Sequence, residues 1–285
     1  MEAWPDVQAS APAVPVSLSR VGVTGVEKVI RIGARGARHP RLYSARLDCY
    51  VDLGPEQKGA HMSRFEEVIN DAIGQVILGE VGLRAEELAQ HIAQRVRERQ
   101  DALRAEVTIG ARYPEYRPRD SGVATQEIYT LYASAVASEH GTRRMAGVAA
   151  QGMTTGLGVG TLHIGSPEDC DIDVDAAALL TIVEESMAGD GTGVEKADRR
   201  PRFAEDCVRE MLRAVLDRYD DLPDHAFVSA RQESIETVHR HNVVAERFGL
   251  VGELRAERRT GVASPHHTSR REWLNAIGAS ARPLG

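Results

Sequence analysis

The chain has 285 residues, enough for one large domain or two modest ones. Hydrophobic residues make up 42% of it and charged residues 27%, which is ordinary for a soluble globular protein, whereas aromatic residues make up only 5%. The net charge of −7 and the isoelectric point near 5.8 argue against a protein that binds the backbone of nucleic acids.

The cysteines and the ends of the chain exclude further classes. Cys49, Cys170 and Cys207 are far apart and form no CxxC pair, so neither a zinc ribbon nor a disulfide framework is expected. The first residues, MEAWPDVQASAPAVP, lack the basic-then-apolar pattern of a signal sequence. No apolar run is long enough to span a bilayer. We therefore expect a cytoplasmic protein without a membrane partner.

The first half of the chain switches from a period of two to a helical period and back again. Ser63 and Glu66 form a capping-box pattern where the helical period begins. The elements expected here are strands over 16–32 and 47–53, helices over 63–77 and 85–100, a strand over 105–111 and a β-rich block over 127–153 with a hairpin break near 139–142.

The second half of the chain repeats this order. The elements expected there are a strand over 161–165, helices over 175–187 and 202–219, and strands over 226–230 and 243–255. The order favours an α+β fold of two tandem ββααββ units with antiparallel sheets and helices on one face. The predicted division is an N-terminal arm (1–15), two units (16–140 and 141–258) and a C-terminal tail (259–285).

Four sequence blocks carry a family resemblance. They are DVQASAPAVPVSLSRVGVTGVEK (6–28), DLGPEQKGAHMSRFEE (52–67), RPRFAEDCVREML (200–212) and ESIETVHRHNVVAER (233–247), with support from TQEIYTL (125–131) and GVAAQGMT (147–154). Together and in this order they resemble the type IB GTP cyclohydrolases, a family that includes archaeal enzymes of methanopterin synthesis and bacterial enzymes of folate biosynthesis.

The resemblance implies the tunnelling fold, with subunits that assemble through their sheets into a homo-oligomer, a tetramer by expectation, with active sites at subunit interfaces. It implies a hydrolase that opens the imidazole ring of GTP at C8, releases formate and gives a dihydroneopterin-type product. A divalent metal (Zn, Fe or Mn) activates water in this family. The expected small-molecule partner is therefore a purine nucleotide or a pterin.

Several residues match the family's motif positions. Glu205, in RFAED, corresponds to the carboxylate that anchors the guanine-like edge, a task that suits an acceptor of two parallel hydrogen bonds. The alternative is a solvated helix carboxylate. His239 and His241, in VHRHN, alternate by two, and one of them is a candidate for proton transfer while the other has a structural role.

A second group surrounds the expected start of the first helix: Lys58, His61, Ser63 and Arg64. Because a helix N-terminus offers free N–H groups, these residues are candidates for gripping phosphate. The alternative is that Ser63 caps the helix, His61 packs, and the two cationic side chains are solvated.

The family pattern fails at the metal. After QGMT the family continues into a C-P-C motif, but here Gly156 and Gly158 occupy the cysteine positions, and the H-N-Q-R motif that follows in the family is missing. Counting back from RFAED places Asp190 where the family has a glutamate ligand. One carboxylate does not hold a catalytic metal, which takes about three protein ligands. Compensation by His163 and Cys170 is the alternative.

Three functions remain open from the sequence. The first is a GTP cyclohydrolase-type hydrolase with a rearranged metal site. The second is a repurposed, metal-free member of the family that acts on another heterocycle in specialised biosynthesis. The third is a non-catalytic binding or assembly subunit. All three functions are compatible with the same fold. They differ in whether the segment around Gly158 and Asp190 takes part in holding a metal.

Overall fold

The computed structural model describes residues 11–33, 41–78, 84–118, 124–154, 157–188, 202–235 and 241–277. The described strands are β1 (Leu18–Ile32), β2 (Arg41–Leu53), β3 (Arg104–Pro118), β4 (Ala124–Ser138), β5 (Gly141–Met153), β6 (Leu157–Ser166), β7 (Phe227–Ile235) and β8 (Asn242–Leu250). The described helices are α1 (Met62–Leu78), α2 (Ala85–Gln100), α3 (Ala176–Ala188), α4 (Ala204–Arg218), α5 (Val251–Thr260) and α6 (Arg270–Asn275).

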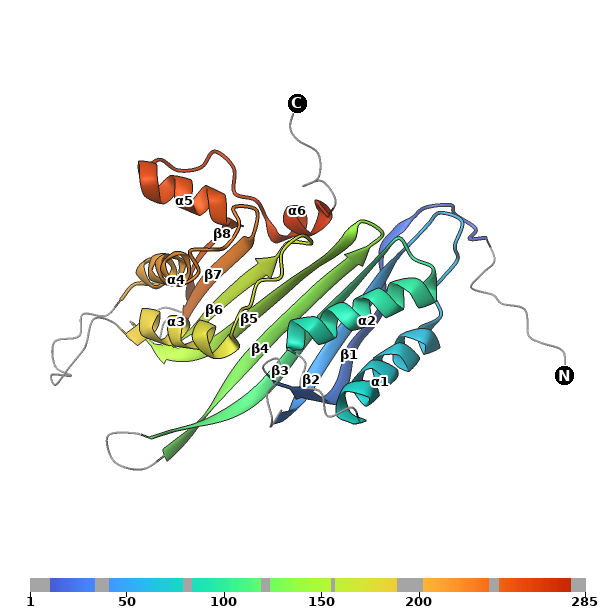
Figure 1. Cartoon of the computed structure of the whole chain (residues 1–285), viewed down its shortest axis with the longest axis horizontal. Coiled ribbons are helices and arrows are strands. Elements are labelled where there is room, and N and C mark those ends of the chain that lie inside the picture. Colours follow the sequence, from blue (N-terminus) through green and yellow to red (C-terminus); the bar gives the residue numbers. More distant parts are fainter. Residues whose placement is uncertain are drawn as a thin grey trace. The chain divides into compact units, whose positions relative to one another are not determined.

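The described strands form one eight-stranded sheet in the order β1 to β8 (Figure 1). The expected fold class, two tandem ββααββ units with antiparallel sheets and helices on one face, is therefore wrong. Strands β4 and β5 are hydrogen-bonded neighbours, so the sheet continues through the point where the two units were expected to part. Two further helices, α5 and α6, follow the last strand. Element order alone does not specify which strands pair, and consecutive strands commonly do.

Contacts within the chain define two compact units. Unit 1 comprises Met1–Ala111, Ala133–Arg144 and Ile277–Gly285, and unit 2 comprises Arg112–Tyr132 and Met145–Ala276. The predicted boundaries at 16–140 and 141–258 stay a prediction about how the chain divides.

In unit 1, α1 and α2 pack against each other and against β1 and β2 (Figure 1). Alternate residues of β2, among them Leu47 and Cys49, are fully buried, as the period of two predicted. Ile69 of α1 and Ile92 of α2 are fully buried as well. Helix α2 has the predicted bounds, and its C-cap is Asp101, whose φ of 53° places it in the left-handed region.

In unit 2, α3 and α4 pack against each other, α3 against β6 and α4 against β7 (Figure 1). Strands β6 and β7 pair antiparallel from Leu157 opposite Ile235 to Gly165 opposite Phe227. One face of each strand is buried beneath the helices, with Leu162 on β6 and Ala230 on β7 at 0% exposure. This helix-covered face carries the site described below.

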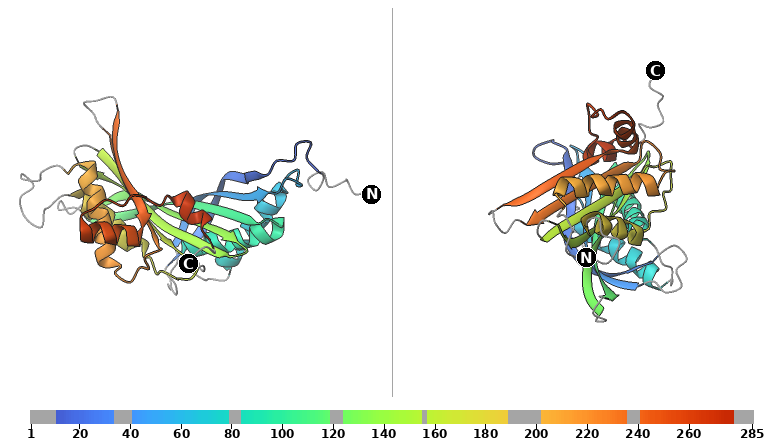
Figure 2. Two further views of the ribbon diagram at one scale, coloured as in Figure 1. Left: turned by 90° about the horizontal axis from the view of Figure 1, so that it is seen from above. Right: turned by 90° about the vertical axis from the view of Figure 1, so that its left-hand side faces the viewer.

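The C-terminal part of the chain differs from its prediction. The strand expected over 243–255 ends at Leu250, and α5 begins at Val251 because the Glu253 carboxylate accepts the Leu250 N–H at 3.2 Å, as a helix-capping side chain does. Figure 2 shows α5 and α6 following β8. Part of the expected tail is thus helical, and Trp273 of α6 is 2% exposed.

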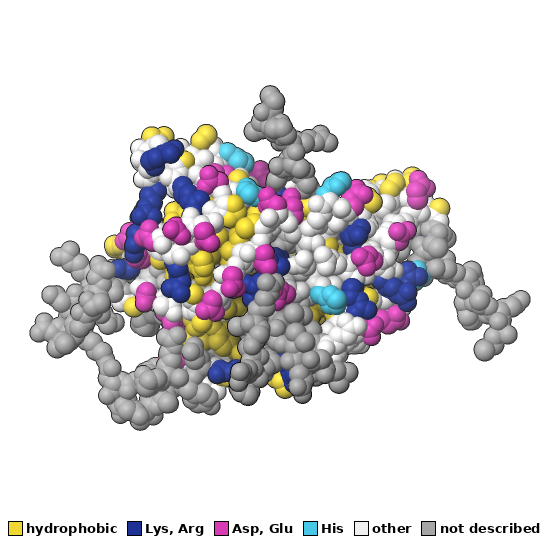
Figure 3. All heavy atoms as spheres, in the orientation of Figure 1, with side chains coloured by type: hydrophobic (Ala, Val, Ile, Leu, Met, Phe, Trp, Pro, Cys, Tyr) yellow, Lys and Arg dark blue, Asp and Glu magenta, His cyan; other side chains and the backbone are white. Residues whose placement is uncertain are grey.

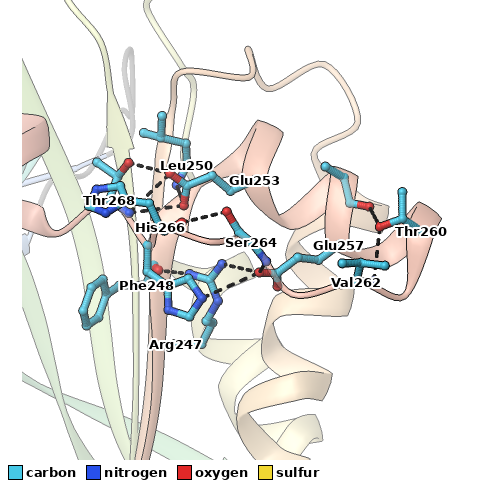
Figure 4. A network of polar contacts seen from close by, with 12 residues as sticks. Arg247, Phe248, Leu250, Glu253, Glu257, Thr260, Val262, Ser264, His266 and Thr268 are labelled. Carbon is cyan, nitrogen blue, oxygen red and sulfur yellow. Dashed lines mark hydrogen bonds and ion pairs between the residues drawn. The ribbon is translucent and has the colours of Figure 1, made fainter.

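A network of polar contacts holds the segment between these two helices (Figure 4). Glu253 accepts a hydrogen bond from the Thr268 N–H at 3.3 Å. Glu257 accepts the Ser264 N–H at 2.7 Å and pairs with Arg247 at 3.1 Å. Two carboxylates one turn apart on α5 therefore fix both ends of the connection to α6.

On the face drawn in Figure 3, acidic and basic side chains are interspersed, so no field of a single sign covers it. A helix with the length and apolar character needed to cross a membrane is not found in the part of the chain that the structure describes.

Candidate functional site

Glu205 lies in the first turn of α4 and is exposed. Acidic side chains are favourable there because of the positive end of the helix dipole. The Arg202 guanidinium, just before the helix, donates to the Ser186 carbonyl oxygen of α3 at 3.1 Å. This contact fixes the start of α4 beside the end of α3. The Glu205 carboxylate is therefore held at a defined place while it stays open to a ligand.

The structure describes only one of the two candidate histidines. His239 lies outside the described residues. His241 is exposed and directly precedes β8, whose first residue, Asn242, pairs with Ile235 at the end of β7. The Asn242 side chain donates to the Glu233 carboxylate at 2.8 Å, and hydrogen bonds from Asn242 and then Arg231 hold the pKa of Glu233 below its usual value. His241 is thus the sequence neighbour of Asn242, whose side chain binds the Glu233 carboxylate of β7.

The four candidate phosphate ligands belong to unit 1. Lys58 and Ser63 are exposed, and Ser63 lies in the first turn of α1, which begins at Met62. The backbone of His61 exchanges hydrogen bonds with the Gln100 side chain, at 3.2 Å and 2.8 Å. The Arg64 guanidinium donates to the Arg99 carbonyl oxygen at 3.3 Å. His61 and Arg64 therefore tie the start of α1 to the end of α2.

The described residues do not fit the family's catalytic metal. Gly156 and Asp190 lie outside them, and within them no group of three or more His, Cys, Asp or Glu side chains gathers as metal ligands would. Gly158 lies in β6 with its α-carbon facing the helices. A Cβ atom built on it would lie 2.3 Å from Nε2 of Gln232, so the Gln232 carboxamide occupies the space a side chain would need.

His163 and Cys170 do not replace the missing ligands. His163 is five positions from Gly158 on the same strand, so its side chain points to the opposite face of the sheet. There the imidazole packs beside Gly147 and the Tyr132 ring, and burial and then Arg270 lower its pKa to about 4. Strand β6 ends at Ser166, about 26 Å along the strand from Gly158, and Cys170 follows this end in the chain.

The third cysteine is also unsuited to metal binding or nucleophilic chemistry. Cys207 is fully buried on α4, and this burial raises the pKa of its thiol. A thiol that stays protonated is a poor ligand and a poor nucleophile.

Gln232 is a feature of this site that no sequence motif indicates. Its side chain points from β7 to the helix-covered face and is 0% exposed. Neither Nε2 nor Oε1 has a hydrogen-bond partner among the described residues. Ser234, the next residue on the same face, is within 3.1 Å of the Thr154 hydroxyl. The signal in the sequence is a glutamine at an inward position of an alternating strand.

The fold resembles that of solved uricases. A hyper-thermostable uricase mutant superposes with a TM-score of 0.57 at 11% identity, over 87% of this chain and 94% of that chain. A uricase from Bacillus fastidious gives a TM-score of 0.52 at 11% identity, over 87% and 98%. At this identity the likeness shows the fold alone.

The sequence defines the family. The model described as type I GTP cyclohydrolase folE2 matches residues 4–156 and 190–245, well over half of the chain. The chain therefore belongs to the type I GTP cyclohydrolase (folE2) family.

Named relatives match over nearly their whole length. The GTP cyclohydrolase MptA of Haloarcula marismortui is 33% identical over 89% of this chain and 97% of its own. The GTP cyclohydrolase MptA of Methanococcus aeolicus is 31% identical over 88% of this chain and 98% of its own. Both alignments, of 307 and 312 positions, are longer than the 285-residue chain, so these relatives carry segments that this chain lacks.

The family model leaves residues 157–189 unmatched. This stretch contains β6 and α3, and it follows directly on Gly156, where the family's cysteine motif is missing. The departure from the family and the packing of Gln232 over Gly158 therefore coincide in one place.

Proposed function

We propose that the chain is a GTP cyclohydrolase-type hydrolase that binds a purine nucleotide and opens its imidazole ring to give a dihydroneopterin-type product. The observation that carries this proposal is the family match on both sides of the altered segment, over 4–156 and 190–245, which includes the Glu205 block. The match covers nearly the whole length of relatives named GTP cyclohydrolase MptA, and these names support the same reaction.

The roles of the residues follow the family's motif positions. Glu205 anchors the N–H donors of the base through its carboxylate, which its exposed place in the first turn of α4 allows. His239 and His241 are the proton-transfer candidates. The residues proposed to hold the phosphates are Lys58, His61, Ser63 and Arg64.

The proposed function assigns a metal at most one ligand position of the family. When bound, a divalent ion would supply an activated water. Asp190 is the one family ligand position that keeps a carboxylate by alignment. The described residues do not gather a ligand set, so the roles proposed above belong to the side chains alone.

The second candidate is a repurposed, metal-free member that acts on a related heterocycle. The observation that favours it is the Gln232 carboxamide in the space above Gly158, the residue that matches the second cysteine of the family's C-P-C motif. This candidate keeps Glu205 as the ligand anchor, so the two candidates differ in their need for metal.

The test measures formate release from GTP and the fluorescence of the pterin product. Glu205→Ala is expected to reduce turnover at least about a hundredfold, because the base loses a charge-assisted pair of hydrogen bonds. Asp206→Asn is the matched control, since Asp206 is exposed in the same helix turn and pairs with Arg209 at 3.1 Å. Unchanged turnover by Glu205→Ala would reject the anchoring role.

The same assay with a chelator separates the two candidates. GTP turnover that is lost with chelator and restored by Fe²⁺, Mn²⁺ or Zn²⁺ supports the metal-dependent hydrolase. Turnover that persists with chelator, with no metal in the purified protein, supports the metal-free candidate. No formate from GTP under any condition rejects the GTP cyclohydrolase proposal.

A further inference from the structure

The Gln232 carboxamide is an unsatisfied polar group in a fully buried place. Its two neighbours on the helix-covered face of β7 are Ala230 and Ser234, and both are buried. Most buried polar atoms in folded proteins have a hydrogen-bond partner, because leaving one unpaired costs its desolvation free energy. Gln232 lacks a partner at both Nε2 and Oε1 among the described residues.

The strand opposite makes room for this side chain. Gly160 pairs with Gln232 in the sheet register, and Gly158 pairs with Ser234. A Cβ atom on Gly160 would lie 3.1 Å from Oε1 of Gln232, and one on Gly158 would lie 2.3 Å from Nε2. Two glycines on one face of β6 therefore let the carboxamide lie flat against the strand.

Val183 of α3 and Met211 of α4 lie over the same position. A Cβ on Gly160 would be 2.7 Å from Val183 Cγ1 and 2.9 Å from Met211 Cε. These groups are apolar, so they offer the carboxamide no hydrogen bond. Methionine is flexible, which makes Met211 the side chain best able to shift for an incoming ligand.

Two hydroxyl groups lie between Gln232 and the exposed end of the β6–β7 pair. The Thr154 and Ser234 hydroxyls lie 3.1 Å apart next to Gln232, and the pair Leu157 and Ile235 at the strand ends is 44% and 45% exposed. Glu205 and Met211 are six residues apart on α4, about 9 Å along its axis. Met211 also lies over Gln232, so the helix that carries Glu205 covers the carboxamide.

From these observations we infer that Gln232 is a substrate-binding residue, which donates from Nε2 to the acceptor nitrogen of the purine's imidazole ring. Oε1 then accepts from a water molecule. This inference rests on the proposed purine-nucleotide function and adds a second contact, on the edge of the base opposite the one that Glu205 would hold. A glutamine suits this place because one planar group offers both a donor and an acceptor.

The experiment compares GTP with 7-deaza-GTP, in which a C–H group replaces the ring nitrogen. Binding to the full-length protein is measured by equilibrium dialysis, and chromatography verifies the bound nucleotide. The wild type is expected to bind GTP about tenfold or more tightly than 7-deaza-GTP. Gln232→Met, which keeps the length of the side chain, is expected to bind both nucleotides equally and weakly.

Controls separate binding from folding. Gln94→Met changes an exposed glutamine of α2 and is expected to retain the preference for GTP. Thermal unfolding of the ligand-free protein shows whether Gln232→Met folds, and Gln232→Leu repeats the measurement if it does not. A glutamine that only binds buried water predicts a less stable variant with unchanged nucleotide preference.

The outcomes distinguish this inference from the proposed function. Loss of the GTP preference in a folded Gln232 variant supports the inference. A wild type without the preference, or a folded variant that keeps it, overturns the inference and leaves the proposed function standing. A wild type that binds neither nucleotide rejects both.

Discussion

Gly160 and Gly74 differ in what surrounds their α-carbons. Gly160 is covered by Val183, Met211 and the Gln232 carboxamide, all within 3.1 Å of a built Cβ, whereas a Cβ on Gly74 of α1 meets nothing within 4 Å. The first glycine is needed for close packing of helices on a strand. The second lies inside a helix, where glycine carries only a backbone-entropy cost.

The two glycines therefore predict opposite effects of the same substitution. Gly160→Ala is expected to lower the free energy of unfolding by about 1–3 kcal/mol, because the added methyl group overpacks the contact with α3 and α4. Gly74→Ala is expected to raise it by about 0.5–1 kcal/mol. Urea unfolding of both variants measures the difference, and a stabilised Gly160→Ala would contradict the described packing.

Trp273 is the largest side chain by which helix α6 packs on unit 2. The Trp273 ring stacks on Phe227 at 5.5 Å between centroids and lies over Gly165, where a Cβ would approach it to 2.6 Å. Its Nε1 donates to the His225 carbonyl oxygen at 3.0 Å. A helix of six residues is too short to be stable alone, so this docking maintains it.

Trp273→Ala is expected to release α6. Removing a buried tryptophan costs about 3 kcal/mol, so the undocked population rises about a hundredfold. Limited trypsin digestion should then cleave at Arg270 or Arg271 at least about tenfold faster than in the wild type. Trp273→Phe keeps an aromatic ring and serves as the control. Equal cleavage rates in the Ala variant and the wild type would show that other contacts hold the helix.

The elements also show where sequence patterns are sufficient. Helix α2 was predicted with its observed bounds because a long amphipathic period and glutamates in its first turn agree. The end of β8 was misplaced, since Val251 and Leu254 continue an apolar pattern that suits a strand or a helix. The carboxylate of Glu253 on the Leu250 N–H favours the helix, and that contact becomes visible only in three dimensions.

For the whole molecule, we expect a homo-oligomer, a tetramer by the family resemblance. Light scattering with size-exclusion chromatography measures the mass of the assembly, and the chain of 31.1 kDa predicts about four times that value. A single species at the monomer mass would contradict this expectation.

The sequence by itself determined the family, most of the elements and the place where the metal pattern fails, because these depend on local periodicity and on motifs contiguous in the chain. The tertiary structure decided that the strands continue as one sheet, since pairing between β4 and β5 joins segments whose patterns are independent. It also decided that Gln232 faces Gly158 and Gly160 without a partner among the described residues, because burial and hydrogen bonding depend on neighbours about seventy residues away in the chain.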